Sequence, residues 1–255
     1  MIERKEILKG GYECMKLKKL LILAGILCCS IISFVYTDFR YYVWTYQFMT
    51  MLPGRTELEF YTRIDQKDFV KPDTAKWKRQ LEIETGLTNC WDFSIYFVDS
   101  YKASDGKTKF DEIKLRTRYK LANKDEFFVD PILYLEYKIQ TDRSYPDKWE
   151  TKLILAKDIG RLNIAVNIIP EEYYKTGTKE KDWKVEYTGG LSYPVIGDIF
   201  RAGAEVKGDL KDEKYYFGPT ISFKGKGIWS AIGAVFGLND KSDNLQMQAI
   251  VGILF

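Results

Sequence analysis

Two carboxylate pairs are the residues best placed for acid–base chemistry: Glu57 with Glu59, and Glu82 with Glu84. Alternate residues of a strand share one face, so each pair would hold two carboxyls side by side and could supply an acid and a base. The sequence has no histidine, and it shows no nucleophile elbow, glycine-rich phosphate loop or metal-ligand cluster. We therefore expect no enzyme, no cofactor and no metal site. We interpret the pairs as charges neutralised by facing Lys or Arg.

Four bases stand on one face of the segment 113–121. Lys114, Arg116, Arg118 and Lys120 alternate there with apolar residues such as Leu115. Each Arg or Lys at the midplane of a bilayer costs about 2 to 4 kcal/mol, so this face must point to a wet or charge-compensated interior. The same split recurs along other segments and adds three interior candidates: Glu136, Arg201 and Glu205.

The composition favours one all-β domain. Across 255 residues the hydrophobic content is 45% and the mean hydropathy is −0.29, which excludes a bundle of membrane helices. The net charge of +3 gives no basic footprint for nucleic acid. Cys90 is the only cysteine beyond residue 29, so no disulfide framework can form in the body of the chain.

Aromatic residues make up 15% of the chain, and many fall near the ends of alternating segments. Such residues are typical of the two levels at which lipid meets water. We expect girdles formed by Trp77, Trp91, Tyr101, Tyr145, Trp149, Tyr173, Tyr174, Trp183, Tyr193, Tyr215, Tyr216 and Trp229.

The body of the chain is a string of alternating segments, each near the length that a tilted strand needs to cross a bilayer. They cover 41–49, 56–65, 78–87, 92–102, 112–122, 131–141, 149–157, 161–169, 183–193, 198–208, 214–223, 227–237 and 244–255. Bacterial single-chain barrels normally have an even number of strands. We expect twelve, with 41–49 outside the barrel wall or another segment false. Fourteen strands, with one more near 34–39, is the alternative.

The connections between these segments alternate in length. Tight turns are expected at 51–55, 88–91, 157–160, 196–198 and 224–226, and longer polar loops at 66–77, 103–111 and 170–182. Short turns at one rim and long loops at the other are typical of outer-membrane barrels, whose short turns lie in the periplasm.

The last strand, 245–255, alternates without a break and ends on Phe255. This ending resembles the C-terminal signature of bacterial outer-membrane β-barrel proteins. The resemblance implies an antiparallel up-and-down transmembrane β-barrel over 38–255, surrounded by outer-membrane lipid and recognised by the barrel-assembly machinery through 245–255. A soluble lipocalin-like barrel is the alternative, since one face of any antiparallel sheet can be wet.

The front of the chain predicts export. Lys16, Lys18 and Lys19 precede the apolar run 20–33, the pattern of a secretory signal peptide. We assign 1–37 to targeting, with Met15 as a possible true start and an uncleaved single-helix anchor as the alternative. We expect the mature protein in the bacterial outer membrane.

Two functions fit a charged interior. In the first, an acidic wall near 57–84 faces a basic wall near 114–120 across a wet lumen, and the barrel is a pore or transporter for small polar solutes. In the second, the charges interlock as salt bridges and fill the barrel. It is then a non-conducting scaffold whose loops, such as 103–111 and 170–182, bind partners. Strand number does not decide between them, and we favour the pore.

Overall fold

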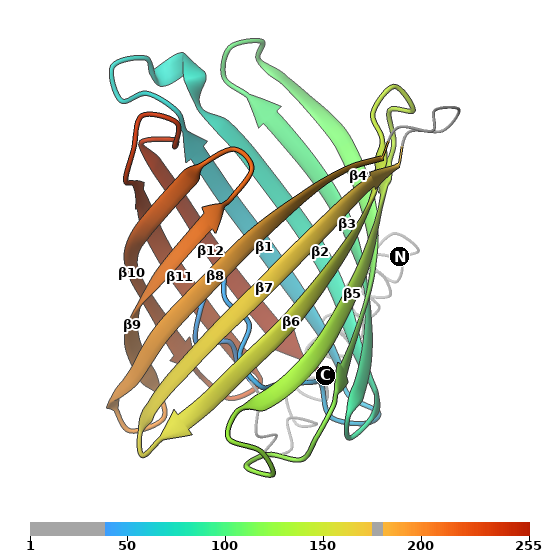
Figure 1. Cartoon of the computed structure of the whole chain (residues 1–255), viewed down its shortest axis with the longest axis vertical. Coiled ribbons are helices and arrows are strands. Elements are labelled where there is room, and N and C mark those ends of the chain that lie inside the picture. The colour runs from blue at the N-terminus through green and yellow to red at the C-terminus, as the bar shows by residue number, and fades with distance from the viewer. Residues whose placement is uncertain (1–38, 175–180) are drawn as a thin grey trace, which may run out of the picture. The chain divides into compact units, whose positions relative to one another are not determined.

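Twelve antiparallel strands close into one barrel (Figure 1) in the computed structural model, which describes residues 39–174 and 181–255. The strands are β1 (Thr56–Gln66), β2 (Lys76–Thr88), β3 (Trp91–Lys102), β4 (Lys107–Lys120), β5 (Asp130–Gln140), β6 (Asp147–Ile159), β7 (Leu162–Tyr174), β8 (Lys181–Ile196), β9 (Phe200–Asp209), β10 (Lys214–Lys224), β11 (Ile228–Gly237) and β12 (Leu245–Leu254). Each pairs with its neighbours in sequence, and β12 pairs with β1. The prediction of a twelve-strand up-and-down barrel is confirmed, and the fourteen-strand alternative is wrong.

The barrel closes beside the C-terminus. The Phe255 N–H donates to the Thr56 carbonyl at 3.0 Å, so the chain ends at the rim where β1 begins. Within the barrel wall the side chains alternate sharply: Phe60 is 45% exposed on the outer face, whereas its neighbours Glu59 and Tyr61 are buried inside. A period of two thus puts ions inside and apolar groups outside.

The two rims differ in their connections, with some exceptions to the expected pattern. Tight turns join β2 to β3, β6 to β7, β8 to β9 and β10 to β11 at what we call the short-turn rim. At the opposite, long-loop rim, the connection at 103–111 is shorter than predicted, because β4 already begins at Lys107 after a turn at Gly106 with φ of 64°. Conversely, β4 and β5 are joined by nine residues, 121–129, at the short-turn rim. The predicted loop 170–182 is wrong at both ends, because β7 continues to Tyr174 and β8 begins at Lys181; residues 175–180 lie outside the described residues.

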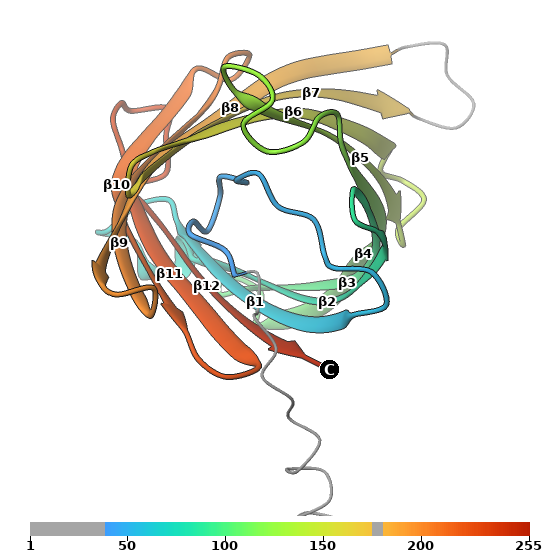
Figure 2. The same ribbon diagram turned by 90° about the horizontal axis from the view of Figure 1, so that it is seen from below.

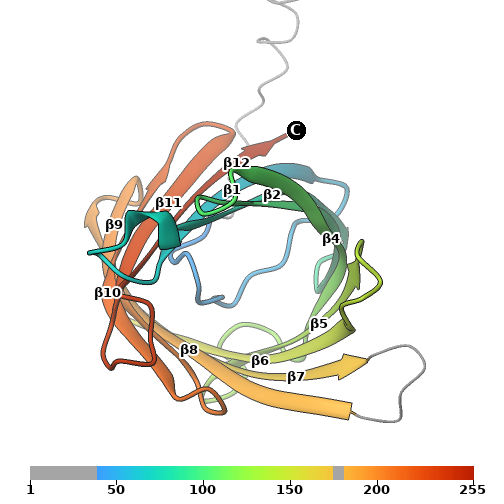
Figure 3. The same cartoon turned by 90° about the horizontal axis from the view of Figure 1, so that it is seen from above.

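Residues 39–51, which precede β1, run inside the barrel (Figures 2 and 3). We call residues 39–51 the luminal loop. It contains the predicted segment 41–49, which is coil and lies outside the barrel wall, as expected. Most of its residues are buried, including Tyr42 and Thr45 at 0% exposure.

Not every predicted girdle residue faces outward. Trp77, Trp91, Trp149 and Trp183 are exposed on the outside, but three others are inside. Tyr173 donates to Glu171 at 3.0 Å, and Tyr216 and Trp229 are buried in a cluster that the luminal loop completes. The prediction for these three is wrong: Tyr216 and Trp229 pack in the apolar interior beside the loop, whereas Tyr173 packs among the interior charges, with Lys148 over its ring.

The described residues include no helix that is both long and apolar enough to cross a membrane. The predicted targeting segment, 1–37, lies outside the described residues.

Candidate functional site in the lumen

The luminal loop enters and leaves the barrel at the short-turn rim. Its two limbs are joined by Gln47, whose side-chain amide donates to the Phe39 carbonyl at 2.8 Å and accepts from the Tyr41 N–H at 3.2 Å. At its far end the loop leads back into β1 past Asp92, whose carboxylate accepts from the Met51 N–H at 3.0 Å. The loop is therefore tied at its base.

Asparagines on the inward face of β7 hold the middle of the loop. Asn167 accepts from the Tyr46 N–H at 2.7 Å and donates to the Tyr46 carbonyl at 2.9 Å. Its side chain therefore gives a hydrogen-bond partner to both backbone groups of Tyr46. The Tyr42 hydroxyl lies 2.9 Å from both the backbone oxygen and Oδ1 of Asn163. Backbone groups that cannot reach a sheet ladder are thus satisfied by the wall.

Two glycines make room for the loop. A Cβ at Gly190 would lie 2.5 Å from Cε1 of Tyr42, and one at Gly233 would lie 2.5 Å from Cγ2 of Val43. Both glycines stand on wall strands, β8 and β11, where glycine otherwise weakens the sheet. Close approach of the loop explains them.

Glu205, on β9, also holds the luminal loop. Its carboxylate accepts hydrogen bonds from the successive N–H groups of residues 43–45, at 2.8, 2.9 and 2.8 Å. A row of backbone N–H groups converging on one anion forms a nest. Glu205 is 1% exposed and forms no ion pair within the described part of the chain.

One of the two predicted carboxylate pairs meets two of the predicted bases in a buried group that we call the arginine cluster: Glu82, Glu84, Asp92, Arg116 and Arg118. Arg116 lies 3.1 Å from Glu82 and 2.8 Å from Glu84, and Arg118 pairs with Glu84 and lies 2.6 Å from Asp92. The prediction of acidic and basic walls facing each other across the lumen is wrong here. Only β3 separates β2 from β4, so the charges neutralise one another along the wall.

Glu57 and Glu59 border this cluster without an ion pair of their own in the described residues. Trp229 donates to Glu57 at 2.6 Å, and the Tyr61 hydroxyl lies between Glu59 and Glu82. Oxygens of Glu59, Glu82 and Glu84 lie within 4.8 Å of one another, close enough to share a metal ion. The guanidinium of Arg116 already supplies positive charge to two of them, so the arrangement favours ion pairing over metal binding.

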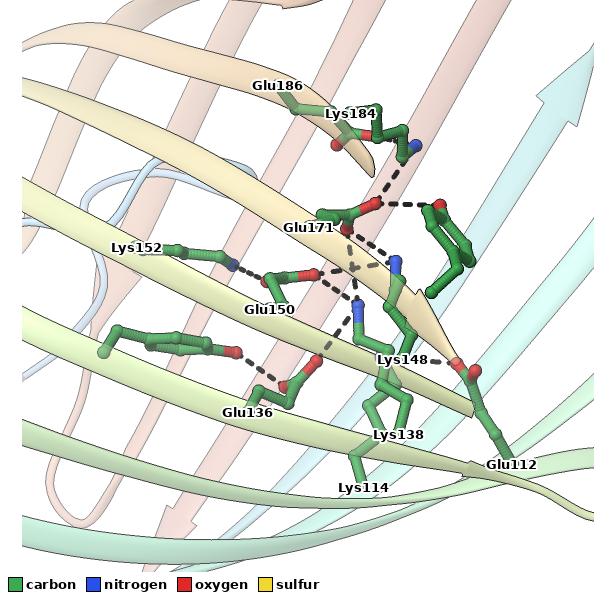
Figure 4. Close-up of polar contacts among 12 residues, drawn as sticks. Glu112, Lys114, Glu136, Lys138, Lys148, Glu150, Lys152, Glu171, Lys184 and Glu186 are labelled. Atoms are coloured by element: carbon green, nitrogen blue, oxygen red, sulfur yellow. Dashed lines mark hydrogen bonds and ion pairs between the residues drawn. The ribbon is translucent and has the colours of Figure 1, made fainter. Parts of the chain in front are cut away.

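A second group, the lysine network, spans β5 to β8 (Figure 4). Glu171 lies between cations, 2.5 Å from Lys148 and 3.2 Å from Lys184, and Glu150 lies 2.8 Å from Lys152. Lys138 pairs with Glu150 and lies 3.1 Å from Glu136, the interior candidate on this strand. These ions bridge neighbouring strands of the wall.

The other candidates lie nearer the short-turn rim or the loop. Lys120 is half-buried and lines a cavity of about 290 Å³ at that rim, together with part of the luminal loop. Lys114 donates to Gln80 at 2.7 Å. The Arg201 guanidinium stacks 3.8 Å from the ring centroid of Tyr41.

On the other side of the luminal loop lies a cavity of about 260 Å³ that we call the central basin. Eight basic residues line it, Arg40, Arg63, Lys78, Lys114, Lys138, Lys148, Lys152 and Lys207, against four acidic ones, Glu136, Glu150, Glu171 and Glu186. Aromatic side chains from the loop and the wall, Trp44, Tyr46, Tyr61, Tyr96 and Tyr134, complete the lining. Three of these bases pair with carboxylates outside the lining, Arg63 with Asp65 and both Lys78 and Lys114 with Glu112. The positive charge that is left over in the basin therefore comes mainly from Arg40 and Lys207.

The mouth at the long-loop rim is also basic. Lys76, Lys102 and Lys107 are directly opposite one another on three adjacent strands and line a cavity of about 600 Å³. Lys109 pairs with Asp142 at 2.9 Å, and hydrogen bonds from Lys109 and Ser144 lower the pKa of Asp142 to about 2.

No protein-family model matches the chain, and no curated protein matches its sequence. Solved structures of outer-membrane channels are similar in fold. The COG4313 outer-membrane channel from Pseudomonas putida F1 has a TM-score of 0.58 at 12% identity over 84% of this chain and all of that one. The KdgM porin in complex with disordered oligogalacturonate gives 0.54 at 12%, and the NanC porin 0.50 at 12%, each over 78% of this chain and 98% of the other. The chain has the fold of an outer-membrane β-barrel.

Proposed function

We propose that this protein is a narrow outer-membrane channel for small anionic solutes, in which the luminal loop forms the constriction. The observation that carries the proposal is the central basin, whose lining holds eight basic and four acidic residues and includes two bases, Arg40 and Lys207, without an ion pair among the described residues. A cleft of one sign in low-dielectric walls concentrates ions of the opposite sign. Its volume of about 260 Å³ lies just below the roughly 300 to 1,000 Å³ of pockets for drug-sized ligands, which favours a small solute.

Two basic residues of the basin lack a carboxylate partner. Arg40, on the loop, and Lys207, on β9, form no ion pair with a carboxylate among the described residues. Arg40 contacts the Tyr61 hydroxyl at 3.2 Å, and Lys207 donates to Gln246 at 3.0 Å. An anion entering from the basic mouth would therefore meet positive charge along its path.

The similar channels support this proposal. One of them, the KdgM porin, was solved with oligogalacturonate, a chain of sugar acids. Its ligand is anionic, in agreement with the charge of the basin.

The test is single-channel recording in a planar bilayer under a KCl gradient. We expect small conductance steps and a reversal potential that indicates anion selectivity. Lys207→Glu reverses one charge in the basin and should shift the reversal potential toward that of a cation-selective pore. Lys211→Glu, in the exposed turn after β9, is the matched control and should leave selectivity unchanged. A cation-selective wild type would contradict the proposal.

The filled scaffold is the second candidate, because the arginine cluster and the lysine network interlock much of the interior charge. A wild-type barrel that folds, inserts and gives no conductance at any voltage would favour it.

Export through 1–37, insertion in outer-membrane lipid and assembly through 245–255 belong to the same proposal. We place the short-turn rim in the periplasm. Deleting Phe255 should reduce the amount of folded, heat-modifiable barrel in the outer-membrane fraction.

A further inference from the structure

Glu205 is the wall residue most dependent on the luminal loop. Its carboxylate is buried, and the hydrogen bonds found for it are those from the N–H groups of residues 43–45. A buried carboxylate without an ion pair is costly unless such donors compensate its charge. The loop supplies that compensation, so Glu205 and the loop stabilise each other.

The loop also bears a cost in this position. Three of its buried polar atoms, Arg40 Nε, Trp44 Nε1 and Thr45 Oγ1, have no protein hydrogen-bond partner. Buried polar groups are normally paired, and an unpaired one is destabilising. These atoms would gain hydrogen bonds if the loop moved into water. The contacts that keep the loop in the lumen must therefore outweigh this cost.

The wall does not share this dependence. β9 is paired along its length on both sides, from Asp209 to Phe200, with β10 on one side and with β8 on the other, where the register shifts between Pro194 and Ile196. The carboxylate of Glu205 takes no part in these ladders. Removing its charge should therefore affect the loop more than the barrel.

We infer that Glu205 is a positioning residue: it keeps the luminal loop across the lumen, and loss of its charge lets the loop leave the constriction while the barrel stays folded. The inference deepens the proposed channel, because the position of the loop would then set the width of the pore. It does not require conduction to be observed, since the position of the loop can be measured directly.

The experiment measures access to the loop. Thr45→Cys is introduced into a full chain whose four cysteines are replaced by serine, and the folded barrel in detergent is treated with a water-soluble maleimide. Thr45 is 0% exposed, so labelling should be slow. In Glu205→Gln the labelling rate should rise about tenfold or more, because labelling follows the population of the opened loop.

Two further variants make the result specific. Glu186→Gln removes another luminal carboxylate, one that makes no hydrogen bond to the loop, and should leave labelling slow. Glu205→Asp keeps the charge but withdraws it by one methylene, and should give an intermediate rate. Heat-modifiable migration on gels reports whether each barrel is folded.

Each outcome decides the inference. An unchanged labelling rate in folded Glu205→Gln would overturn it; if that variant does not fold, a wild-type rate in folded Glu205→Asp would do the same. Faster labelling together with larger conductance steps supports both the inference and the channel. Faster labelling in a barrel that never conducts supports the role of Glu205 and rejects the channel.

Discussion

Replacing Arg116 by glutamine should destabilise the barrel strongly. Arg116 is 2% exposed and pairs with both Glu82 and Glu84. Removing one partner of a buried ion pair costs about 3 to 5 kcal/mol, because the other charge stays buried without compensation. Glu84 keeps Arg118, whereas Arg116 is the only cation within ion-pair distance of Glu82 in the described residues. The substitution therefore leaves mainly one carboxylate without a partner. We expect a loss in the free energy of unfolding at the lower end of this range, about 3 kcal/mol.

The assay is equilibrium unfolding in urea, followed by tryptophan fluorescence and by gel mobility. With a slope of roughly 2 kcal/mol per molar, the midpoint of Arg116→Gln should fall by about 1.5 M. The double variant Arg116→Gln with Glu82→Gln should recover part of this loss, because the stranded carboxylate is gone. Lys109→Gln breaks an exposed pair at the rim and should shift the midpoint by less than about 0.5 M. Two results would refute the reasoning. One is a urea midpoint for Arg116→Gln within about 0.5 M of wild type. The other is a double variant whose loss equals the sum of the losses in the two single variants.

Three further predictions concern the loop and the rim. Asn167→Leu leaves both backbone groups of Tyr46 without their partner and should cost about 1 to 3 kcal/mol in the same unfolding assay; no loss would mean that the loop is not held at this point. Gly190→Val places a side chain where the Tyr42 ring lies, so single-channel recording should show larger conductance steps than wild type, and unchanged steps would count against the loop as constriction. At the rim, hydrogen bonding lowers the pKa of Asp142 from 3.8 to about 2. Since its folded-state pKa is depressed, the stabilising contribution of this carboxylate is present above about pH 4 and is lost as the pH falls through 2. Carbon-13 NMR of the carboxyl should show that midpoint, and titration near 3.8 would contradict it.

The wall of the barrel was predictable because period-two alternation survives locally in nearly every strand. The boundary of β4 was not. A bulge shifts the pairing between Val98 and Asp99, so that Val98 pairs with Glu112 and Asp99 with Phe110. The extra residue breaks the alternation, and 107–111 therefore looked like loop. Such a shift depends on the partner strand, which a single segment does not reveal.

The interior charges were predictable as a set but not as pairs. A charged face cannot point to lipid, which places Arg116 and Glu82 inside whatever the register. Which carboxylate pairs with which base depends on how the side chains of β2 and β4 reach across β3. Ser94, the β3 residue opposite Arg116, is small enough to let these side chains meet. The luminal loop was missed altogether as part of the site. The aromatic run at 41–46 suggested a strand, and the cues to its real position, Asn163 and Asn167 on an inward face, read as ordinary polar residues.

The distribution of interior charge follows the position of the loop. An eight-stranded barrel is just filled by its own side chains, so a twelve-stranded one encloses space that must hold water, ions or additional chain. Between their ends, the inward faces of β10 to β12, which the structure describes in full, carry no charged side chain: Val235 and Ile250 are buried in the cluster that contains Val43 and Trp44, and Gln248 donates to the Val43 carbonyl. Across the barrel, β4 to β8 carry the arginine cluster's bases and the lysine network. Glu205 is the acidic residue on the loop side, and it faces the backbone N–H groups rather than a cation. The wall thus holds the luminal loop on one side and carries most of the interior charge on the other.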